Sequence, residues 1–425
     1  MTAAAVPLAP PARAAVDAIA EVDILVGIPS FNNVHTIGHV VRAVSAGLGK
    51  YFPDSRAVIV NSDGGSTDGT PEAVADADLP NPGALLVRHA LPPVHRIVTP
   101  YQGIPGKGSA FRTIFAIAEQ LGAKACAVFD ADLRSITPEW VQFLVGPVLE
   151  RGFDFAAPLY ARHKHDGTIT NSIVYPMTRA LYGRDLRQPI GGDFGFSGRL
   201  ASHYLAKPVW DSSVARFGID IWMTTTAIAD GFKVCQSFLG AKIHDPKDPG
   251  TSLAEMLQQV VSSVFELMAT YRDRIAAVGQ PEAVPLFGFV HEVGLEPIPV
   301  NVEGMLAIYR QAARDLPELW ERILRPATLS EIVAHAARPN GRFHLDDELW
   351  VRVVYDFAVA HQRRVLRPEQ VLGALVPLYL GRTASFVLET EKSRPAEVET
   401  AIQALAQEYL RQKDELIARL GAQEV

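Results

Sequence analysis

The sequence has few of the features that mark secreted or nucleic-acid-binding proteins. Only two cysteines occur in 425 residues, Cys126 and Cys235, and both lie inside apolar segments. They are expected to be reduced core residues of a cytoplasmic protein rather than a disulfide framework. Acidic residues outnumber basic ones by 47 to 40, which gives a formal net charge of −7. Nucleic acid is therefore not an expected partner, because neutralising phosphates needs a basic face.

Signals for export and for membrane insertion are also missing from the sequence pattern. The first twenty residues are rich in Ala and Pro and lack a basic start followed by an apolar run, which predicts a flexible tail rather than a secretion signal. No stretch of about 18 apolar residues is evident, which argues against a membrane span. A hydrophobic content of 48% with 20% charged residues indicates a soluble, cytoplasmic, well-cored protein.

What the sequence does contain, over residues 21–250, is an alternation of short apolar strands and helices. Such an alternation predicts an α/β domain with a parallel sheet covered by helices on both faces. The expected strands are 23–28, 57–60, 95–99 and 125–129, and the expected helices are 36–48, 109–121 and one that follows Thr67.

Ligands of such sheets collect at the carboxyl ends of the strands. Four polar or glycine-rich loops are expected to meet at that edge: 29–33, 61–68, 103–108 and 130–132. From residue 251 to 425 the pattern changes to successive amphipathic helices, which predicts a separate helical domain. The expected helices are 251–274, 302–325, 346–364, 367–380 and 396–420.

The motif with the most chemical content is Asp130-Ala-Asp132, directly after an apolar strand. Alternation along a strand would put both carboxylates on one face, where they could hold Mg²⁺ or Mn²⁺ beside a diphosphate. The plain structural alternative is a polar strand end, with one Asp capping the helix that starts near Thr137. The motif alone favours neither interpretation.

Other loops add weaker signals. Lys107 stands in a glycine-rich turn before a helix, where backbone amides and an ammonium group could hold a phosphate. The turn 61–68, with Ser62 and Asp63, could contact a nucleoside or could simply cap a helix. A paired glycine, Gly191-Gly192, precedes Asp193 and would allow close approach of the backbone to a ligand.

Asp220 lies in the first turn of a predicted helix, and His244 ends a short predicted strand. Imidazole suits Mn²⁺ as a ligand, although a lone histidine is more often structural. Asp220 and His244 are the last candidate site residues along the chain.

In this order the motifs resemble the nucleotide-sugar-dependent glycosyltransferases of the GT-A fold. The match is to the retaining group that contains the glucosyl-3-phosphoglycerate synthases and the mannosylglycerate synthases. The motifs that carry the resemblance are Pro29, 65–68, 105–108, 130–132, 188–193, 218–220 and His244. The resemblance covers about residues 23–250, and it implies a GT-A-like domain followed by a helical one.

The resemblance also implies roles for these residues. Asp132 and His244 would bind Mg²⁺ or Mn²⁺, while Asp130, Asp132, Lys107 and Asp220 would form the catalytic set. The nucleotide sugar would be bound by Pro29, Phe31, Asn33, Ser62, Asp63, Lys107, Asp130, Gly191, Gly192 and Asp193. Retention of the anomeric configuration is implied, with no strong general base.

The acceptor is expected to be a small hydroxy acid held by Arg162, Thr178 and Gly192. Members of the group that use phosphoglycerate carry an Arg just before a Thr, whereas Met177 precedes Thr178 here. The missing cation favours glycerate, and a glucosylglycerate-type compatible solute as the product. Arg179, Lys164 or Arg184 could restore phosphate recognition, so glucosyl-3-phosphoglycerate and mannosylglycerate synthesis stay as alternatives.

Three more distant functions remain to be weighed. An inverting polysaccharide-type transferase would use Asp193 or Asp220 as a general base. A nucleotidyltransferase would need a basic, glycine-rich signature after the first strand, which 29–33 does not supply. A binding module without catalysis would not need candidate ligands at three separate positions. The protein is expected to be a homo-oligomer whose substrates are a nucleoside diphosphate sugar and a hydroxy acid.

Overall fold

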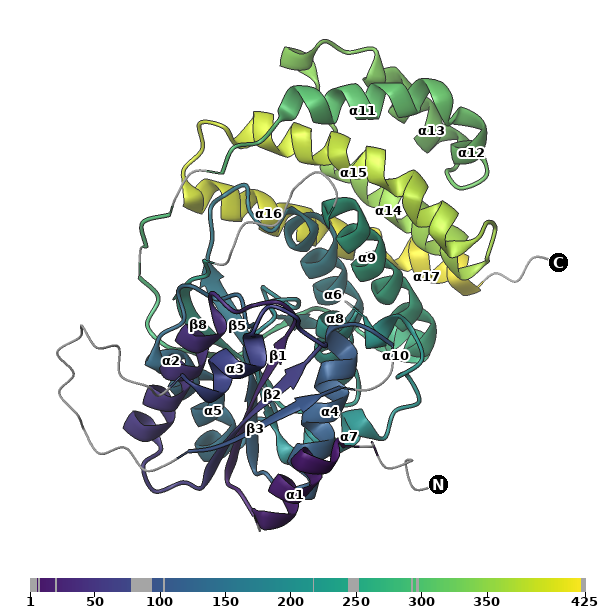
Figure 1. Cartoon of the computed structure of the whole chain (residues 1–425). Helices are drawn as coiled ribbons and strands as arrows, with labels where there is room; N and C mark the ends of the chain where they lie inside the picture. Colours follow the sequence, from purple (N-terminus) through teal and green to yellow (C-terminus); the bar gives the residue numbers. More distant parts are fainter. Residues whose placement is uncertain are drawn as a thin grey trace. The chain divides into compact units, whose positions relative to one another are not determined.

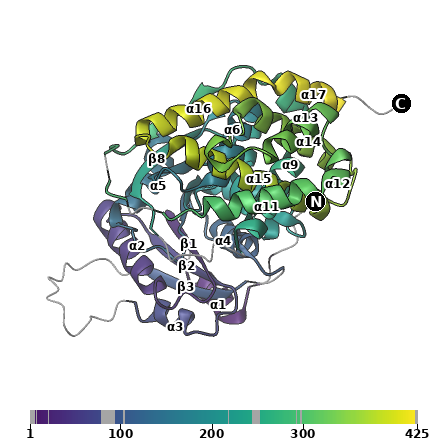
Figure 2. The same cartoon turned by 90° about the horizontal axis from the view of Figure 1, so that it is seen from above.

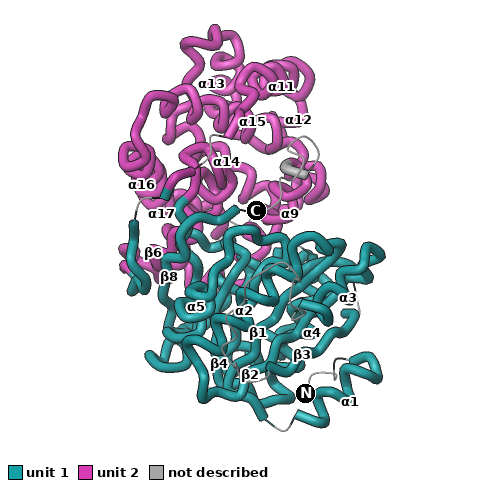
Figure 3. The backbone as a smooth tube through the Cα atoms, turned by 60° about the vertical axis from the view of Figure 1, so that its left-hand side comes forward, with its two compact units in different colours: residues 1–161, 188–247, 284–293 teal, residues 162–187, 248–283, 294–425 magenta. Residues whose placement is uncertain are grey.

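A computed structural model describes residues 6, 8–19, 21–77, 94–101, 104–216, 218–243, 252–291, 293–295 and 298–421. The chain divides into two compact units (Figure 3). Unit 1 consists of residues 1–161, 188–247 and 284–293, and unit 2 of residues 162–187, 248–283 and 294–425. The predicted boundary at residue 250 therefore needs correction, because 162–187 belongs to unit 2 and 284–293 to unit 1.

Unit 1 is built on the sheet to which β1, β2, β3, β5 and β8 belong (Figure 1). Among the described residues this sheet has eight strands, in the order β10-β8-β5-β7-β4-β1-β2-β3. Neighbouring strands run parallel except that β7 is antiparallel to both β4 and β5. The α/β prediction is confirmed, with β7 as the exception to a purely parallel sheet. The strands are Ile24–Ser30 (β1), Ala57–Asp63 (β2), His95–Pro100 (β3), Ala125–Val128 (β4), Phe155–Ala161 (β5), Phe194–Ser197 (β7), Val234–Ala241 (β8) and Leu286–Phe287 (β10).

Helices cover both faces of this sheet, which explains the continuous apolar runs at the centre of β1 and in the first half of β2. Figure 2 shows α2 and α4 on opposite sides of β1, β2 and β3. Ile24, Val26 and Ile28 of β1 share a buried cluster with residues of α2 and α5. Gly27 faces the other way, where a β-carbon would stand 2.7 Å from Ile114 of α4. The helices of unit 1 are Pro10–Ala18 (α1), Ile37–Tyr51 (α2), Thr70–Ala75 (α3), Lys107–Gln120 (α4), Pro138–Arg151 (α5), Gly198–Leu205 (α7) and Ile219–Ala229 (α8), with the short turn Ser213–Ala215 (η2).

Two details of the N-terminal region differ from the prediction. Helix α1 lies within the expected flexible tail, because Ala12 and Val16, four residues apart, bury one face of a short helix that starts at Pro10. Strand β1 does not stop at Pro29 but continues to Ser30, with Pro29 buried. Its pairing with β4 has already ended at Gly27, so Pro29 lies past the part of β1 that has a neighbour on both sides.

Unit 2 is mainly helical, as predicted, although prolines divide the expected helices differently. The expected helix 302–325 is two helices, α11 and α12, since Pro317 starts a new one, and Pro326 starts α13. The elements are Thr170–Val174 (η1), Tyr175–Tyr182 (α6), Arg184–Asp185 (β6), Ser252–Thr270 (α9), Arg272–Ala277 (α10), Glu282–Ala283 (β9), Val302–Asp315 (α11), Pro317–Glu321 (α12), Pro326–Ala336 (α13), Asn340–Arg342 (η3), Asp347–Gln362 (α14), Pro368–Thr390 (α15), Pro395–Arg411 (α16) and Lys413–Gly421 (α17).

Helix α15 corrects the statement that no long apolar stretch exists. It runs to Thr390, ten residues beyond the predicted end, and by length and composition it could cross a membrane, with a mean hydropathy of 1.6. Of its most apolar window, 78% is buried inside the protein. Burial of this kind is typical of the core helix of a globular unit.

Candidate active site in unit 1

The carboxyl ends of β1, β2 and β3 lie at one edge of the sheet, as predicted. Ser30 is the register partner of Asp63, and Asp63 in turn is that of Pro100. The loop after β1 is tied to the loop after β2, because the backbone amide of Asn32 donates to Oγ of Ser66 (2.8 Å) and that of Asn33 donates to Oγ1 of Thr70 (2.8 Å). These bonds join two of the predicted site loops into one surface.

Asp130 and Asp132 belong to this edge, but the reason given for their pairing was wrong. Strand β4 ends at Val128, and both aspartates lie in the turn that follows it. Strand alternation therefore does not place their side chains. The backbone amide of Asp130 instead donates to Oδ1 of Asp193 (2.7 Å), which fixes the turn from a loop about sixty residues further along the chain.

Two lysines form ion pairs with the Asp130 carboxylate, one at each of its oxygens. Nζ of Lys107, the first residue of α4, lies 2.7 Å from Oδ1 of Asp130. Nζ of Lys242, just past the end of β8, lies 2.8 Å from Oδ2. Lys107 also lies 3.2 Å from Oδ1 of Asp220. The structure thus brings together Lys107, Asp130 and Asp220, all three predicted from the sequence.

Asp193 differs from its predicted role as a sugar contact. Its side chain is 0% exposed, and its oxygens accept hydrogen bonds from Nζ of Lys242 (2.9 Å), from the amide of Asp130 (2.7 Å) and from the hydroxyl of Tyr160. Because protein donors occupy it on every side, Asp193 anchors the turn of Asp130 rather than meeting a ligand.

The electrostatics of the cluster follow from burial and charge. Burial acts to raise the pKa of Asp130, but the charges of Lys107 and Lys242 outweigh it and hold that pKa well below its usual range. For Asp220, burial dominates and raises the pKa, against the charge of Lys107. Burial likewise raises the pKa of Asp193, against Lys242. Burial would lower the pKa of Lys107, yet Asp130 and Asp220 raise it overall, so Lys107 is cationic.

The paired glycines allow this packing. Gly192 has a φ of +90°, and a β-carbon there would overlap the carboxylate of Asp130 and stand 3.0 Å from Nζ of Lys242. A β-carbon on Gly191 would overlap the ring of Pro158. Both predicted glycines are therefore needed for close approach of the backbone to the cluster.

The predicted nucleoside residues divide into exposed and buried ones. Phe31 is 61% exposed at the end of β1, and the side chain of Asn33 accepts the amide of Phe31 (2.9 Å). Ser62 is buried, and so is Asp63, whose carboxylate accepts from Ser30 and from the amides of Gly65 and Ser66. Asp63 shapes the turn, and Ser62 faces the interior, so neither buried side chain presents a polar group to a nucleoside.

The predicted acceptor residues lie in different units. Gly192 is in unit 1, whereas Arg162 and Thr178 are in unit 2. Arg162 is 23% exposed, with Nη1 3.5 Å from Oδ2 of Asp166, four residues on. Thr178 is buried within α6.

The metal site is only partly covered by the described residues. Asp132 lies half-buried at the sheet edge, but His244, the second predicted ligand, lies outside the described residues. Within the described ranges no cluster of three or more His, Cys, Asp or Glu side chains forms a metal site. The two oxygens of Asp130 lie 2.7 Å and 2.8 Å from the ammonium groups of Lys107 and Lys242.

Sequence reasoning missed Lys242 and Tyr160. Lys242 is 5% exposed and lies 5.2 Å from the centre of the Tyr160 ring. The one feature of the sequence that could have pointed to Lys242 is its position at the end of an apolar strand, two residues before His244. A buried lysine needs anionic partners, and these come from loops distant in sequence, so the sequence alone could not identify them.

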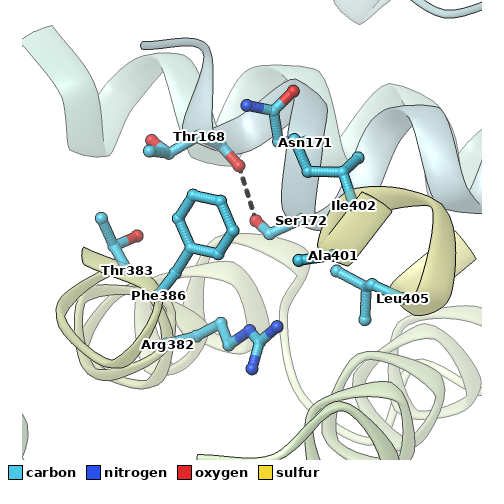
Figure 4. Close-up of a pocket in the computed structure, with 9 residues that line it drawn as sticks. All are labelled: Thr168, Asn171, Ser172, Arg382, Thr383, Phe386, Ala401, Ile402 and Leu405. Atoms are coloured by element: carbon cyan, nitrogen blue, oxygen red, sulfur yellow. Dashed lines mark hydrogen bonds between the residues drawn. The ribbon is translucent and has the colours of Figure 1, made fainter. Parts of the chain in front are cut away.

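Two cavities lie away from this cluster. The one in Figure 4, in unit 2, has a volume of about 20 Å³, which is room for one water molecule. Ser172 there donates to the carbonyl of Thr168 (2.7 Å). A larger cavity of about 490 Å³ lies in unit 1 against α5 and the end of β8, with Phe143, Phe238 and His291 in its wall. Neither wall includes a predicted site residue.

Comparison with known proteins gives matches among solved structures alone. No family model matches the chain, and no curated protein matches it. The chain is similar to glucosyl-3-phosphoglycerate synthase from Mycobacterium tuberculosis in complex with Mn²⁺, UDP and glucosyl-3-phosphoglycerate, at a TM-score of 0.45 and 22% identity over 61% of this chain and 84% of that one. The same synthase with Mn²⁺, UDP-glucose and phosphoglyceric acid gives a TM-score of 0.44 and 22% identity over 63% and 84%. A structure described as a mycobacterial protein gives 0.43 and 22% over 61% and 78%.

Proposed function

We propose that this chain is a retaining glycosyltransferase that moves a hexose, with glucose as the expected sugar, from a nucleoside diphosphate sugar to the hydroxyl of glycerate. The observation that carries the proposal is Lys107, a partly buried cation at the first turn of α4 and at the carboxyl edge of the sheet. A helix N-terminus and an ammonium group together suit a diphosphate. The exposed ring of Phe31 at the same edge suits stacking against a nucleoside base.

The reaction breaks the bond between the sugar and the diphosphate, and negative charge develops on the leaving phosphate oxygen. Lys107 would offset that charge from within hydrogen-bonding reach. Mg²⁺ or Mn²⁺, when bound by Asp132 and His244, would supply further positive charge at the diphosphate. The departing phosphate oxygen would take the proton of the acceptor hydroxyl on the same face of the sugar, which retains the anomeric configuration.

The basic side chains of unit 2 that were considered for the acceptor all have protein partners. Lys164 donates to the carbonyl oxygens of Thr390 (2.8 Å), Glu391 (2.6 Å) and Ser393 (3.1 Å) at the C-terminus of α15. Arg184 pairs with Glu282, and Arg179 lies 3.6 Å from Oδ1 of Asp185. Each of the three cations named as a substitute phosphate ligand thus has an acidic or carbonyl partner. Arg162 has such a partner as well, Asp166 at 3.5 Å. The choice of glycerate therefore rests on the sequence, where Met177 precedes Thr178, and Arg162 is the residue proposed to hold the glycerate carboxylate.

Consumption of a donor tests this function directly. The protein is incubated with Mg²⁺ or Mn²⁺, glycerate and one of the UDP-, GDP- or ADP-linked hexoses, and release of the nucleoside diphosphate is followed. One donor is expected to be consumed, and Lys107→Met is expected to lower its kcat/KM by about 10- to 100-fold for each charge-assisted hydrogen bond lost. Lys124→Met is the matched control, because Lys124 is an exposed lysine paired with Asp23 at the opposite end of β4.

Inverting transfer is the second candidate, and Asp220 is the observation in its favour. Its side chain is 15% exposed beside Lys107, and burial raises its pKa towards that of a working base. Asp193, the other candidate base, is enclosed by protein donors. The anomeric configuration of the product, read by NMR, separates the two mechanisms: retention supports the proposal and inversion supports Asp220 as a base.

A further inference from the structure

Lys242 has no hydrogen-bond donor left for a ligand. An ammonium group has three donors, and Nζ of Lys242 uses them on Oδ2 of Asp130 (2.8 Å), the carbonyl oxygen of Gly191 (2.8 Å) and Oδ2 of Asp193 (2.9 Å). Its side chain is 5% exposed. A substrate could bond to this ammonium group only by displacing one of these protein acceptors.

Lys107 is held more loosely. Its Nζ has one short contact, 2.7 Å to Oδ1 of Asp130. Its other acceptors are longer, at 3.2 Å to Oδ1 of Asp220 and 3.4 Å to the carbonyl oxygen of Gly192. At 17% its side chain is also more exposed than that of Lys242. Of the two lysines, Lys107 is therefore the one that can exchange a protein acceptor for a phosphate oxygen.

The Oδ2 side of the Asp130 carboxylate is therefore held by Lys242, whose ammonium group is itself fixed by Asp193 and Gly191. Lys242 donates a hydrogen bond to Oδ2 of Asp130. The carboxylate of Asp193 accepts hydrogen bonds from the backbone amide of Asp130 and from the ammonium group of Lys242. Gly192 leaves no room for Asp130 to turn towards it, since even a β-carbon would overlap the carboxylate. Asp193 and Lys242 together fix the main chain and the side chain of Asp130.

We propose that Lys242 is a positioning residue that, with Asp193, fixes the Asp130 carboxylate so that Lys107 alone is released to the diphosphate. This inference rests on the proposed function. When Lys107 turns to the diphosphate, Asp130 loses one cationic partner, and Lys242 keeps the partly buried carboxylate neutralised. The side chain of Asp130 then keeps its place while the donor is bound and the sugar is transferred.

Removing Lys242 would leave the fully buried Asp193 without that cation, and the partly buried Asp130 with Lys107 but without Lys242, so that variant is used to measure stability. Lys242→Met is expected to lower the melting temperature by on the order of 10 °C, because breaking a buried ion pair is strongly destabilising. The additional substitution Asp193→Asn removes the negative charge of Asp193, and it is expected to restore much of the lost melting temperature. If Lys242→Met melts within about 2 °C of the wild type, the buried network is not as described.

The double variant Lys242→Met/Asp193→Asn separates positioning from folding and from diphosphate binding. Its affinity for UDP, GDP or ADP, whichever the wild type binds, is measured by calorimetry and is expected to stay within about threefold. Lys107→Met is expected to weaken the same affinity by about tenfold or more. Turnover by the double variant is expected to fall by about 100-fold in kcat, because the reacting groups are no longer fixed in place. Lys242→Arg in place of Met should recover part of kcat.

Three results would overturn the inference. Loss of diphosphate affinity in the double variant equal to that of Lys107→Met would mean that Lys242 touches the diphosphate. A kcat within about threefold of the wild type would leave it no positioning role. A rise in the acceptor KM alone would place Lys242 on the acceptor. Absence of both diphosphate binding and turnover in the wild type contradicts the proposed function instead, and the melting series still tests the Lys242–Asp193 pair by itself.

Discussion

Gly192 lies against the carboxylate of Asp130 so closely that a β-carbon at residue 192 would overlap it. The backbone of Gly192 also has a φ of +90°, a conformation that side-chain-bearing residues rarely adopt. The loop 188–193 therefore contributes to the site through the backbone of Gly192 as well as through the side chain of Asp193.

The variant Gly192→Ala should consequently displace Asp130 and lower kcat by about 100-fold. Gly146→Ala is the matched control, since no atom lies within 4 Å of a β-carbon at that position of α5. The control should leave activity unchanged and stability equal or higher by up to about 1 kcal/mol. Steady-state kinetics and thermal melts of both variants test this, and equal activity of the two would contradict the described packing.

A second prediction concerns the proposed metal. Asp132→Asn should weaken the affinity for Mn²⁺, measured by calorimetry with the nucleoside diphosphate present, by at least about tenfold, because one of the two proposed protein ligands loses its charge. A chelator should inactivate the wild type, and added Mn²⁺ should restore it. Normal affinity in Asp132→Asn, or full activity in the chelator, would exclude this assignment.

The acceptor role of Arg162 can be separated from its ion pair with Asp166. Arg162→Ala should raise the KM for glycerate by about 10- to 100-fold while the KM for the donor stays unchanged, since a charge-assisted pair with the acceptor carboxylate is lost. Asp166→Ala removes the same ion pair from the other side. If the two variants lose the same activity, Arg162 acts through that ion pair and does not bind the acceptor.

Stability should depend on pH through His361 in α14. Within the described part of the chain neither of its ring nitrogens has a hydrogen-bond partner, and burial lowers its pKa. Below the unfolded pKa of about 6.5 the unfolded state then binds more protons than the folded one, so this residue reduces stability as the pH falls. Denaturant unfolding at pH 7 and pH 5 should show a smaller loss of stability in His361→Leu than in the wild type. An equal loss would show that His361 is not buried in its neutral form.

Much of the sheet could be predicted because each of its central strands is a short apolar run. This is why β1 to β4 lie close to their expected positions. Strand β7 was missed because Phe194–Ser197 is four residues long and directly follows the glycine-rich loop, which gave no strand pattern. The discontinuous units were missed because long-range contacts, and not local composition, assign 162–187 to unit 2.

The candidate site was predicted in part for the same reason. Lys107, Asp130 and Asp220 follow or begin recognisable elements, so their meeting at one edge could be inferred. The burial of Ser62, Asp63 and Asp193 depends on contacts with residues distant in the sequence, such as Ser30 for Asp63 and Asp130 for Asp193. A local sequence pattern does not show such contacts. Lys242 was overlooked because a single lysine forms no recognisable sequence motif. Its role in the site depends on the three acceptors that surround its ammonium group, and these come from other loops.

Transfer of a hexose to glycerate is best tested by identifying the product. The protein is incubated with Mg²⁺ or Mn²⁺, the donor that it consumes, and either glycerate or 3-phosphoglycerate; the products are identified by mass spectrometry and NMR. The expected result is a hexosylglycerate with retained anomeric configuration and a higher kcat/KM for glycerate than for 3-phosphoglycerate. A clear preference for 3-phosphoglycerate would contradict the acceptor assignment, and transfer to neither acceptor with any donor would contradict the proposed function.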